Sequence, residues 1–443
     1  MKPSKVTILF QRRVNSIHFQ TNASGAISPT ITLRAGCPYT PRWVWGDGTA
    51  DGSGANPGGH TYTGAGTRTI TIILPHADYW MTGIDVHSCS ITGDFMAALR
   101  QCRSLTNITA YNNTALNSHY RLADLPASMT YLQLSGTPST ITGALADLPA
   151  GMTYLQLYYT SSTITGALAD LPAGMTYLLL SGTPSTITGA LANLPASMTY
   201  LLLSGTPSTI TGALADLPAG MTSLQLGGTS STITGALANL PAGMTFLDLS
   251  GTSSTITGAL ADLPAGMTYL LLGGTLSTIT GALADLPAGM TYLLLYNTLS
   301  TITGALANLP AGMTYLLLGG TPSTITGALA DLPASMTYLD LSGTSSTITG
   351  GATAVPAHAI GLVYLDSTTM TQAQVDGVAL RLYTDRAVFT AAAPTLNIGG
   401  SNPAPSGIYQ DANPPTTGKE YIYTLVNDPR VEGFKKWSIT YTA

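Results

Sequence analysis

The side chains that could perform chemistry lie almost entirely in the two flanks of this chain. Acid–base, nucleophilic and metal chemistry require converging side chains that titrate or coordinate. Between residues 122 and 350 the sequence contains no His, Cys, Lys, Arg or Glu. The histidines are scattered outside that stretch, at His18, His60, His76, His87, His119 and His358. No pair of them has metal-ligand spacing with a third donor, and no serine lies in a nucleophile elbow. We therefore predict no catalytic, cofactor-binding or metal site, and a protein that is not an enzyme.

Aspartate is the acidic side chain of the central stretch, and it recurs in one column. The column comprises Asp124, Asp147, Asp170, Asp216, Asp262, Asp285 and Asp331, with Asn193, Asn239 and Asn308 at equivalent positions. Since an amide replaces the carboxylate without other adjustment, a loop hydrogen bond is favoured over a ladder of metal ions.

In the N-terminal flank, residues 47–52 resemble the start of a calcium loop, but Gly58 stands where a closing acidic ligand is needed. An Asp-Gly turn is favoured there, with calcium binding as the alternative.

Charge is scarce in this chain. Only 8% of the residues are charged, the net charge is −5, and no Lys or Arg lies between Arg121 and Arg381. Nucleic acids and anionic membranes attract basic surfaces, so neither is an expected partner.

The cysteines and the apolar segments suggest neither a disulfide scaffold nor a membrane protein. For Cys37, Cys89 and Cys102, free buried thiols are favoured over pairing of the last two. The apolar run at residues 6–10 is interrupted by Gln11-Arg12-Arg13, so we expect a strand there and no cleaved signal peptide. No segment reaches the roughly 18 apolar residues that span a bilayer.

Methionine recurs every 23 residues from Met129 to Met336, which indicates a repeated structural unit. In each unit two leucines alternate with other residues, as in a short strand with one buried face. More apolar residues follow on the return path. In the first regular unit these positions are Leu132, Leu134, Ile141, Leu145 and Leu148. One unit cannot bury them alone, so the units are expected to stack, with stability summed over neighbours.

The unit is similar to the leucine-rich repeat, whose scheme LxxLxLxx(N/T)xLxGxLxxLPxx it matches, and its Thr-Gly pair resembles the second strand of plant-type repeats. The resemblance implies a mainly β leucine-rich-repeat solenoid with short helical or irregular returns. Irregular units at 84–86 and 108–110 and a decayed one at 362–364 extend it over residues 81–366. Thr137 and its equivalents stand where the family has Asn, which Asn113 retains. A threonine hydroxyl can make fewer of the loop hydrogen bonds.

The two flanks are predicted to be separate modules. Trp43 to Thr49, His60-Thr61-Tyr62 and Gly66 to Ile72 resemble the PKD domain, a small Ig-like β-sandwich, although Arg68 stands where that family prefers Tyr. This implies a β-sandwich at 1–80. At 367–443 a helix beginning at 371–376 and strands at 395–399 and 437–441 predict an α/β C-terminal capping module. Residues 400–406 resemble the closing module of phage-encoded and bacterial surface repeat proteins.

The candidate binding residues flank the inward leucine of each strand, on the face that is concave in leucine-rich repeats. One column contains Tyr131, Tyr154, Tyr177, Tyr200, Ser223, Phe246, Tyr269, Tyr292, Tyr315 and Tyr338. The neighbouring column contains Gln133, Gln156, Leu179, Leu202, Gln225, Asp248, Leu271, Leu294, Leu317 and Asp340. A contiguous row of exposed tyrosine and leucine indicates an interface with a cell-surface protein or glycan, or with another copy of the chain. The alternative is that the stacked rings only shield one another.

A rival face is formed by the Thr-Ile-Thr segments. If Ile141 points inward, its flanking threonines project about 6.6 Å apart along the strand and about 4.8 Å between units. Such arrays resemble those of ice-binding solenoids. The sequence therefore predicts a non-enzymatic recognition or adhesion protein, such as a phage tail fibre or decoration protein, located on a virion or cell surface. A self-assembling extracellular filament or surface layer and an ice-binding solenoid are the alternatives.

Overall fold

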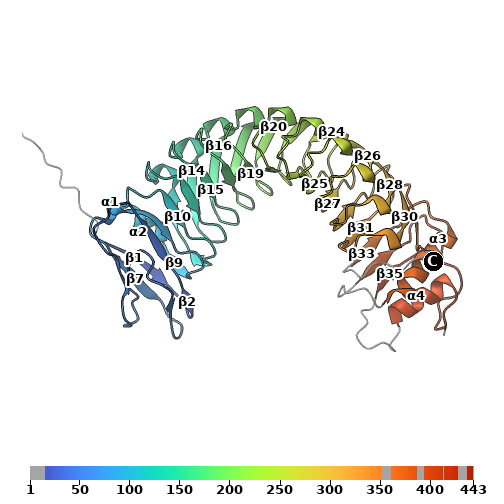
Figure 1. Ribbon diagram of the computed structural model, residues 1–443, viewed down its shortest axis with the longest axis horizontal. Coiled ribbons are helices and arrows are strands. Elements are labelled where there is room, and N and C mark those ends of the chain that lie inside the picture. The colour runs from blue at the N-terminus through green and yellow to red at the C-terminus, as the bar shows by residue number, and fades with distance from the viewer. Residues whose placement is uncertain (1–14, 352–360, 387–393, 413, 428–436, 443) are drawn as a thin grey trace, which may run out of the picture. The chain divides into compact units, whose positions relative to one another are not determined.

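The computed structural model describes residues 15–351, 361–386, 394–412, 414–427 and 437–442. The chain divides into two compact units. Figure 1 shows the strands and short helices from which they are built. Unit 1 comprises Met1–Gly189 and Asn193–Ser208, and unit 2 comprises Ala190–Ala192 and Thr209–Ala443. Both are built mainly from parallel strands joined by short returns. The expected strand at residues 6–10 and His358 lie outside the described residues.

The N-terminal segment of unit 1 is folded from short, mostly antiparallel strands. Its elements are β1 (Ser16–Thr21), β2 (Ala26–Ile27), β3 (Thr30–Leu33), β4 (Arg42–Val44), β5 (Gly52–Ser53), β6 (His60–Thr61), β7 (Arg68–Ile73), α1 (Ala77–Trp80), β8 (Met81–Asp85), β9 (Ile91–Gly93), α2 (Phe95–Leu99), β10 (Asn107–Thr109), β11 (Ala115–Leu116) and β12 (His119–Arg121). One sheet has the order β11-β9-β1-β7-β4-β5, and β2 pairs with β6. β1 also pairs with β9, and β3 pairs with β8. Strands from both sides of the predicted boundary at residue 80 therefore share two sheets, and that boundary stays a prediction.

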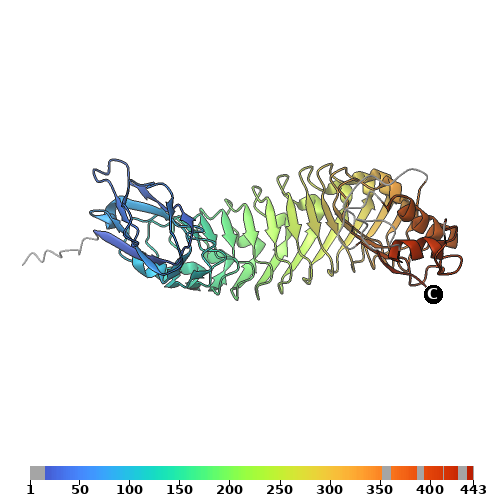
Figure 2. The same ribbon diagram turned by 90° about the horizontal axis from the view of Figure 1, so that it is seen from below.

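The regular repeats form coils, each of which contributes one strand to a first parallel sheet. These strands are β13 (Tyr131–Gln133), β15 (Tyr154–Gln156), β17 (Tyr177–Leu179), β19 (Tyr200–Leu202), β21 (Ser223–Gln225), β23 (Phe246–Asp248), β25 (Tyr269–Leu271), β27 (Tyr292–Leu294), β29 (Tyr315–Leu317) and β31 (Tyr338–Asp340). β8 and β10 precede β13 in the sheet, and β33 (Leu362–Tyr364) follows β31, as expected for the irregular repeats. The pairing repeats every 23 residues, so that Leu247 lies opposite Leu270. Figure 2 shows the strands side by side within each unit.

Each coil returns through a second parallel strand, and a single 3-10 turn follows where the return is described. The second strands are β14 (Thr140–Ala144), β16 (Thr163–Ala167), β18 (Thr186–Ala190), β20 (Thr209–Ala213), β22 (Thr232–Ala236), β24 (Thr255–Ala259), β26 (Thr278–Ala282), β28 (Thr301–Ala305), β30 (Thr324–Ala328) and β32 (Thr347–Thr349). The turns are η1 (Leu122–Asp124), η2 (Leu145–Asp147), η3 (Leu168–Asp170), η4 (Leu191–Asn193), η5 (Leu214–Asp216), η6 (Leu237–Asn239), η7 (Leu260–Asp262), η8 (Leu283–Asp285), η9 (Leu306–Asn308) and η10 (Leu329–Asp331). The protein is thus a leucine-rich-repeat solenoid, as predicted.

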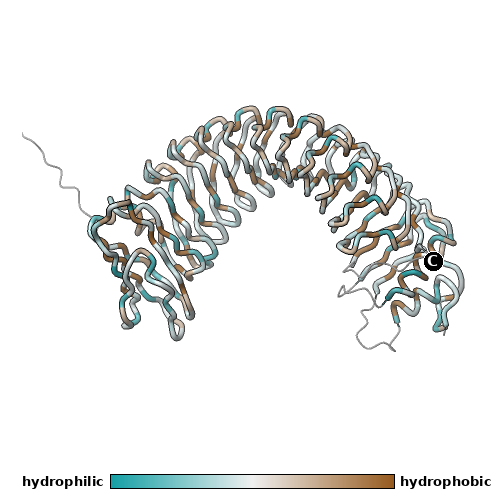
Figure 3. Tube along the Cα trace, viewed as in Figure 1, coloured by the Kyte–Doolittle hydropathy of each residue, from teal (hydrophilic) through white to brown (hydrophobic). Residues whose placement is uncertain are grey.

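The core of every regular coil is a ring of aliphatic side chains. In one coil of unit 2, Met267, Leu270, Leu272, Ile279 and Leu283 are fully buried and Leu286 is 8% exposed. The inward leucines and isoleucine were predicted from their spacing. The methionine was identified only as a marker of the period, yet it is equally buried. Hydrophobic residues recur in this way along both units (Figure 3).

The aspartate column has the structural role that its exchange with asparagine indicates. Asp285 is the last residue of η8, and its Oδ2 accepts a hydrogen bond at 2.9 Å from the backbone N–H of Ala282. Asn239 occupies the same place and accepts from Ala236 at 3.4 Å. The predicted loop hydrogen bond is confirmed. Among the described residues no group of three His, Cys, Asp or Glu side chains could hold a metal ion.

Two columns of buried polar side chains lie inside the coils, threonine at the position of Asn113 and serine two residues later. Asn113 donates to the carbonyls of Val86 and Ala110 and accepts from the N–H of Ile91. In a regular coil Thr183 donates to the carbonyl of Leu180 at 2.6 Å, and its Oγ1 lies 2.8 Å from the Oγ of Ser185. Ser185 in turn accepts from the N–H of Ile164 in the preceding coil at 3.0 Å. Thr183 thus keeps the asparagine's bond to the carbonyl three residues earlier, and a separate column of buried serines, which sequence reasoning missed, bonds the preceding coil.

The C-terminal segment of unit 2 extends the first sheet. The predicted helix is α3 (Gln372–Thr384), which Thr371 caps, and the predicted strands are β34 (Thr395–Asn397) and β35 (Ser438–Thr440). A further helix, α4 (Gly418–Asn427), was not predicted. β33, β34 and β35 pair in parallel. The parallel sheet therefore continues beyond residue 366, where the repeats were expected to end, because later strands with little sequence similarity to the repeat still offer free edges for pairing.

The cysteines agree with the expectation of free thiols. Cys37, Cys89 and Cys102 are free, and the last two are buried, so the free-thiol interpretation is confirmed. Burial raises the pKa of Cys89 to about 11 and that of Cys102 to about 12.

Within the described ranges, no helix has both the length and the apolar character that crossing a membrane requires.

Candidate binding face

In unit 1 the aromatic column forms a stacked row of rings on the first sheet, which we call ladder 1 (Tyr131, Tyr154, Tyr177 and Tyr200). The parallel register places each tyrosine directly opposite the next one. Ring centroids of Tyr131 and Tyr154 are 4.2 Å apart, and those of the next two pairs are 5.2 Å apart. Burial raises the pKa of Tyr131 and Tyr154. The rings are therefore held in contact by the strand spacing itself.

In unit 2 a second row, ladder 2, contains Phe246, Tyr269, Tyr292, Tyr315 and Tyr338. Centroid separations along the first four rings are 4.6, 4.5 and 4.5 Å, and Tyr315 and Tyr338 are 5.8 Å apart. Tyr364 adds one more ring, 5.8 Å from Tyr338, although it comes from the neighbouring column and was not among the predicted residues. Ser223, the small residue of the column, is fully buried.

The outer surface of both ladders is only partly covered. Each predicted ring is intermediate in exposure, because stacking covers the ring faces and leaves the edges accessible. The predicted leucines beside them, Leu179, Leu202, Leu271, Leu294 and Leu317, are also partly exposed. Mutual shielding of the rings thus occurs, and a mixed aromatic and aliphatic surface remains. The use of that surface as a binding site stays a proposal.

Polar residues of the neighbouring column fix parts of this face. The hydroxyl of Tyr131 donates to Gln133 at 2.6 Å, and that of Tyr154 donates to Gln156. Asp248 accepts from the N–H of Ser250 at 2.9 Å, and burial raises the pKa of Asp248. The polar side chains that interrupt the leucine column therefore have hydrogen-bond partners within the chain. The coils with leucine in this column are the ones that expose apolar surface.

A pocket of about 340 Å³ lies beside ladder 2, where the first strands end. It is lined by Tyr296, Asn297, Gly319, Gly320, Asp340, Ser342, Gly343, Asp366 and Ser367. Burial and the charge of Asp340 raise the pKa of Asp366. The sequence did not identify this pocket, since the lining residues come from successive coils.

The threonine face differs from the array expected from the sequence. Thr257 lies opposite Thr278 of the next coil, and Ala259 lies opposite Thr280. Neighbouring second strands are thus offset by two residues, and equivalent threonines do not stand side by side. The expectation of unbroken threonine columns with about 4.8 Å between units is wrong, because register is set by strand pairing and not by the repeat length. Gly281, with φ +123°, permits this close approach, since a Cβ there would lie 3.1 Å from the nitrogen of Leu260.

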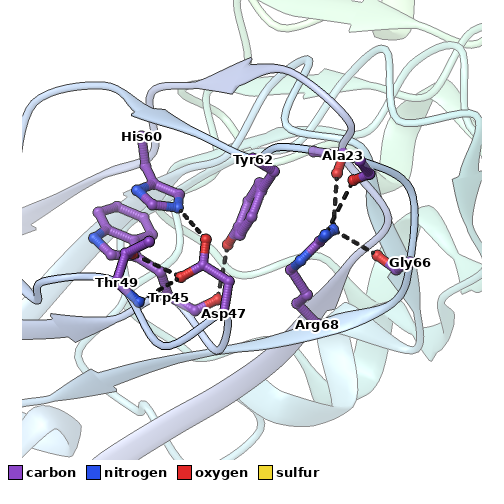
Figure 4. A network of polar contacts seen from close by, with 9 residues as sticks. Ala23, Trp45, Asp47, Thr49, His60, Tyr62, Gly66 and Arg68 are labelled. Carbon is purple, nitrogen blue, oxygen red and sulfur yellow. Dashed lines mark hydrogen bonds and ion pairs between the residues drawn. The ribbon is translucent and has the colours of Figure 1, made fainter.

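The residues that resemble a PKD domain form one polar and aromatic network in unit 1 (Figure 4). Asp47 Oδ1 accepts from the N–H and the hydroxyl of Thr49, at 3.1 and 2.6 Å, and its Oδ2 lies 2.8 Å from His60 Nε2. The His60 ring stacks on Trp45 at 4.5 Å. Both carboxylate oxygens are occupied, which favours the Asp-Gly turn over calcium binding. Arg68 lies 4.7 Å from the ring centroid of Tyr62.

We expect the Asp47 contacts to make the N-terminal segment sensitive to acid. Although burial raises the pKa of Asp47, hydrogen bonds from Thr49 and His60 lower it to about 2, from an ordinary value of 3.8. A depressed folded-state pKa gives stability that is present above pH 4 and lost as the pH falls towards 2. Tryptophan fluorescence, to which three of the four tryptophans contribute from this segment, should show wild type melting above Asp47→Asn at pH 6. The difference should shrink between pH 4 and pH 2.

The matched control is Asp51→Asn, which removes an exposed ion pair with Arg42. Surface pairs contribute little, so this variant should melt close to wild type at every pH. A constant gap between wild type and Asp47→Asn down to pH 2 would contradict the prediction.

Comparison with known proteins adds the following findings. No family model and no curated protein matches this chain. Among solved structures, it is similar to the leucine-rich-repeat ectodomain of the Arabidopsis thaliana membrane receptor kinase GASSHO1/SCHENGEN3, with 15% identity, a TM-score of 0.36, and coverage of 70% of this chain and 46% of that one. It is similar to the ectodomain of the Arabidopsis receptor kinase HAESA with a peptide hormone ligand, with 15% identity, a TM-score of 0.44, and coverage of 73% and 63%. A leucine-rich-repeat protein of Leptospira interrogans matches with 13% identity, a TM-score of 0.37, and coverage of 64% and 78%. The chain therefore spans less than two thirds of the two receptor ectodomains.

Proposed function

We propose that this protein is a non-enzymatic recognition protein, and that each ladder with its flanking leucines binds an extended segment of a protein partner. The observation that carries the proposal is the row of half-buried aromatic rings beside partly exposed leucines, repeated at one strand spacing. Rings held by stacking lose little side-chain freedom on binding, and tyrosine is enriched in interfaces for related reasons. The low charge of the coils favours contacts through shape and apolar area over electrostatic steering.

The location that we propose is a virion or a cell surface, with a role as an adhesion or fibre protein. The support is the PKD-like network in the N-terminal segment and the resemblance of residues 400–406 to the closing modules of phage-encoded and bacterial surface proteins. A cell-surface protein is the partner that we propose first. A glycan, or a second copy of the chain in a filament or surface layer, is the alternative.

Replacing two rings of ladder 2 tests the role of this face. The variant Tyr269→Ser/Tyr292→Ser should fold like the wild type, because the chain itself carries a serine, Ser223, in this column. Peptides selected on the wild-type protein from a displayed library of random peptides should bind the variant at least about tenfold more weakly, since each lost ring removes an anchor worth 1 kcal/mol or more. Fluorescence anisotropy of the selected peptides measures the affinities.

The control variant Thr280→Ser/Thr303→Ser makes two matched changes on the second sheet and should leave the affinities unchanged. Equal binding by the wild type and the tyrosine variant would refute the proposed face. Sedimentation tests the self-assembly alternative, which requires concentration-dependent assembly that the tyrosine variant loses. The ice-binding alternative requires thermal hysteresis that a bulky residue at position 257, in place of Thr257, abolishes. The offset of neighbouring threonines argues against this alternative, because equivalent threonines do not lie side by side.

A further inference from the structure

Tyrosine is the only readily oxidised kind of side chain that the regular coils expose. Between residues 122 and 350 the sequence contains no Cys, His or Trp. The methionine of every regular coil is fully buried. The tyrosines of ladder 2 are partly exposed, because stacking covers the ring faces and leaves the edges accessible. A one-electron oxidant that reaches these coils therefore meets phenol groups first.

Neighbouring phenols of ladder 2 lie at the distance that a bond between their rings requires. The parallel register places Tyr269 opposite Tyr292, and Tyr292 opposite Tyr315. Ring centroids are 4.5 Å apart in both pairs, with 19° and 12° between the ring planes. In a biphenol the two ring centres are about 4.3 Å apart, because a C–C bond of about 1.5 Å joins the rims of the rings. Coupling would therefore turn the rings about their side-chain torsions and leave the strands in place.

We propose that Tyr269, Tyr292 and Tyr315 form a site of oxidative coupling, at which a peroxidase supplied with hydrogen peroxide converts two neighbouring tyrosines to dityrosine. Each phenol gives one electron to the oxidant and its proton to water, and becomes a phenoxyl radical. The two radicals join through the Cε carbons next to the hydroxyl groups, and the hydrogen on each of these carbons moves to the phenol oxygen. Two tyrosines and one hydrogen peroxide thus give one dityrosine and two water molecules.

The fixed stacking favours coupling within one molecule. Groups that are held side by side react as if at a very high local concentration, so a radical on Tyr292 meets one on its neighbour before it meets another chain. The product joins adjacent coils covalently, as a disulfide joins chain segments in other proteins. Cysteine supplies no such link here, because the three cysteines are free. The reaction involves no bound partner, so the inference stands apart from the proposed recognition function.

Ladder 2 contains an internal control, because its first ring has no hydroxyl. Phe246 stacks on Tyr269 with centroids 4.6 Å apart and 17° between the planes, which is nearly the geometry of Tyr269 and Tyr292. A phenyl ring cannot form a phenoxyl radical. The first pair should therefore remain uncoupled under conditions that couple the second.

Mass spectrometry of the oxidised full chain distinguishes these pairs. Dilute protein is treated with peroxidase and hydrogen peroxide and then cleaved before aspartate. This cleavage places the rings in separate fragments, with Phe246 in residues 216–247, Tyr269 in residues 262–284 and Tyr292 in residues 285–330. The Tyr269 and Tyr292 fragments should be recovered joined, with the mass of two hydrogen atoms missing. The Phe246 fragment should be recovered unjoined.

Two matched variants and one denatured sample assign the bond to the ladder. Tyr292→Phe keeps the ring, as at Phe246, and should lower the yield of joined fragments at least about tenfold, because Tyr269 then has no phenol beside it. Tyr296→Phe makes the same change in the same coil but outside the ladder, and should leave the yield unchanged. Oxidation in concentrated guanidinium chloride should lower the yield at least about tenfold, because unfolding removes the stacking.

Far-UV circular dichroism first establishes that both variants are folded. Absence of joined fragments from the folded wild type would overturn the coupling site, as would an unchanged yield in Tyr292→Phe or in guanidinium chloride. Two Tyr269 fragments joined to each other would show coupling between molecules, and their predominance would also overturn it. The binding experiment with Tyr269→Ser/Tyr292→Ser has a separate readout, so its failure would count against the proposed function alone.

Discussion

Replacing Leu270 by alanine is expected to lower the free energy of unfolding of unit 2 by about 2–5 kcal/mol. Leu270 is fully buried, and the sheet register places it between Leu247 and Leu293 of the adjacent coils. Truncation removes the apolar contact and leaves a cavity that rigid neighbouring coils close only partly. Chemical denaturation followed by far-UV circular dichroism measures the change. Hydrogen exchange should show the largest loss of protection in β23, β25 and β27, because each coil contacts mainly its neighbours.

Leu276 provides a matched control for this experiment. It lies in the same coil but is 63% exposed. Leu276→Ala is therefore expected to change the stability by no more than about 0.5 kcal/mol. Similar effects of the two substitutions would show that the coils do not pack as described.

Removing one buried hydroxyl, in Ser185→Ala, is expected to cost roughly 1–3 kcal/mol. The side chain of Ser185 accepts from Ile164 N–H at 3.0 Å, lies 2.8 Å from the Thr183 hydroxyl oxygen, and donates to the carbonyl of Ser162 at 3.3 Å. Alanine leaves the buried N–H of Ile164 without its acceptor, and the serine is fully buried, so water cannot replace the bond. The melting temperature and the exchange rate of the Ile164 amide report the loss.

Ser161→Ala is the control, since Ser161 is exposed at the corresponding turn of the preceding coil. It should leave both readouts within the error of the wild type. If Ser185→Ala proved equally silent, the hydroxyl ladder would contribute nothing to the pairing of the coils.

The substitution pattern predicted the interior of the coils well. Leucine and isoleucine at fixed spacing have one way to leave water, which is to face a common core, and every such position is buried. The exchange of Asp285 with Asn239 at one position correctly indicated a loop hydrogen bond. The stacking of the tyrosines followed from the same argument, because residues at equal positions of paired parallel strands lie side by side.

Features that depend on pairing between coils were missed or predicted incorrectly. The serine column is hydrophilic, so no hydropathy pattern marks Ser185 as buried. Its environment is fixed by Ile164 and Thr183. The prediction of the threonine array assumed that equivalent residues of neighbouring second strands lie opposite each other. The second strands instead pair with an offset of two residues.

The sequence by itself determined the period, the inward-facing residues and the scarcity of charge that limits the chemistry of the coils. Each follows from local properties, namely side-chain hydropathy and residue type, that the chain carries before it folds. Only the tertiary structure decided which surface residues of different coils meet. The offset of the second strands and the two ladders depend on interstrand pairing, and the pocket unites Tyr296 with Asp366 through stacking of the coils between them. Hydrogen bonds between strands set those distances, and a single repeat cannot specify them.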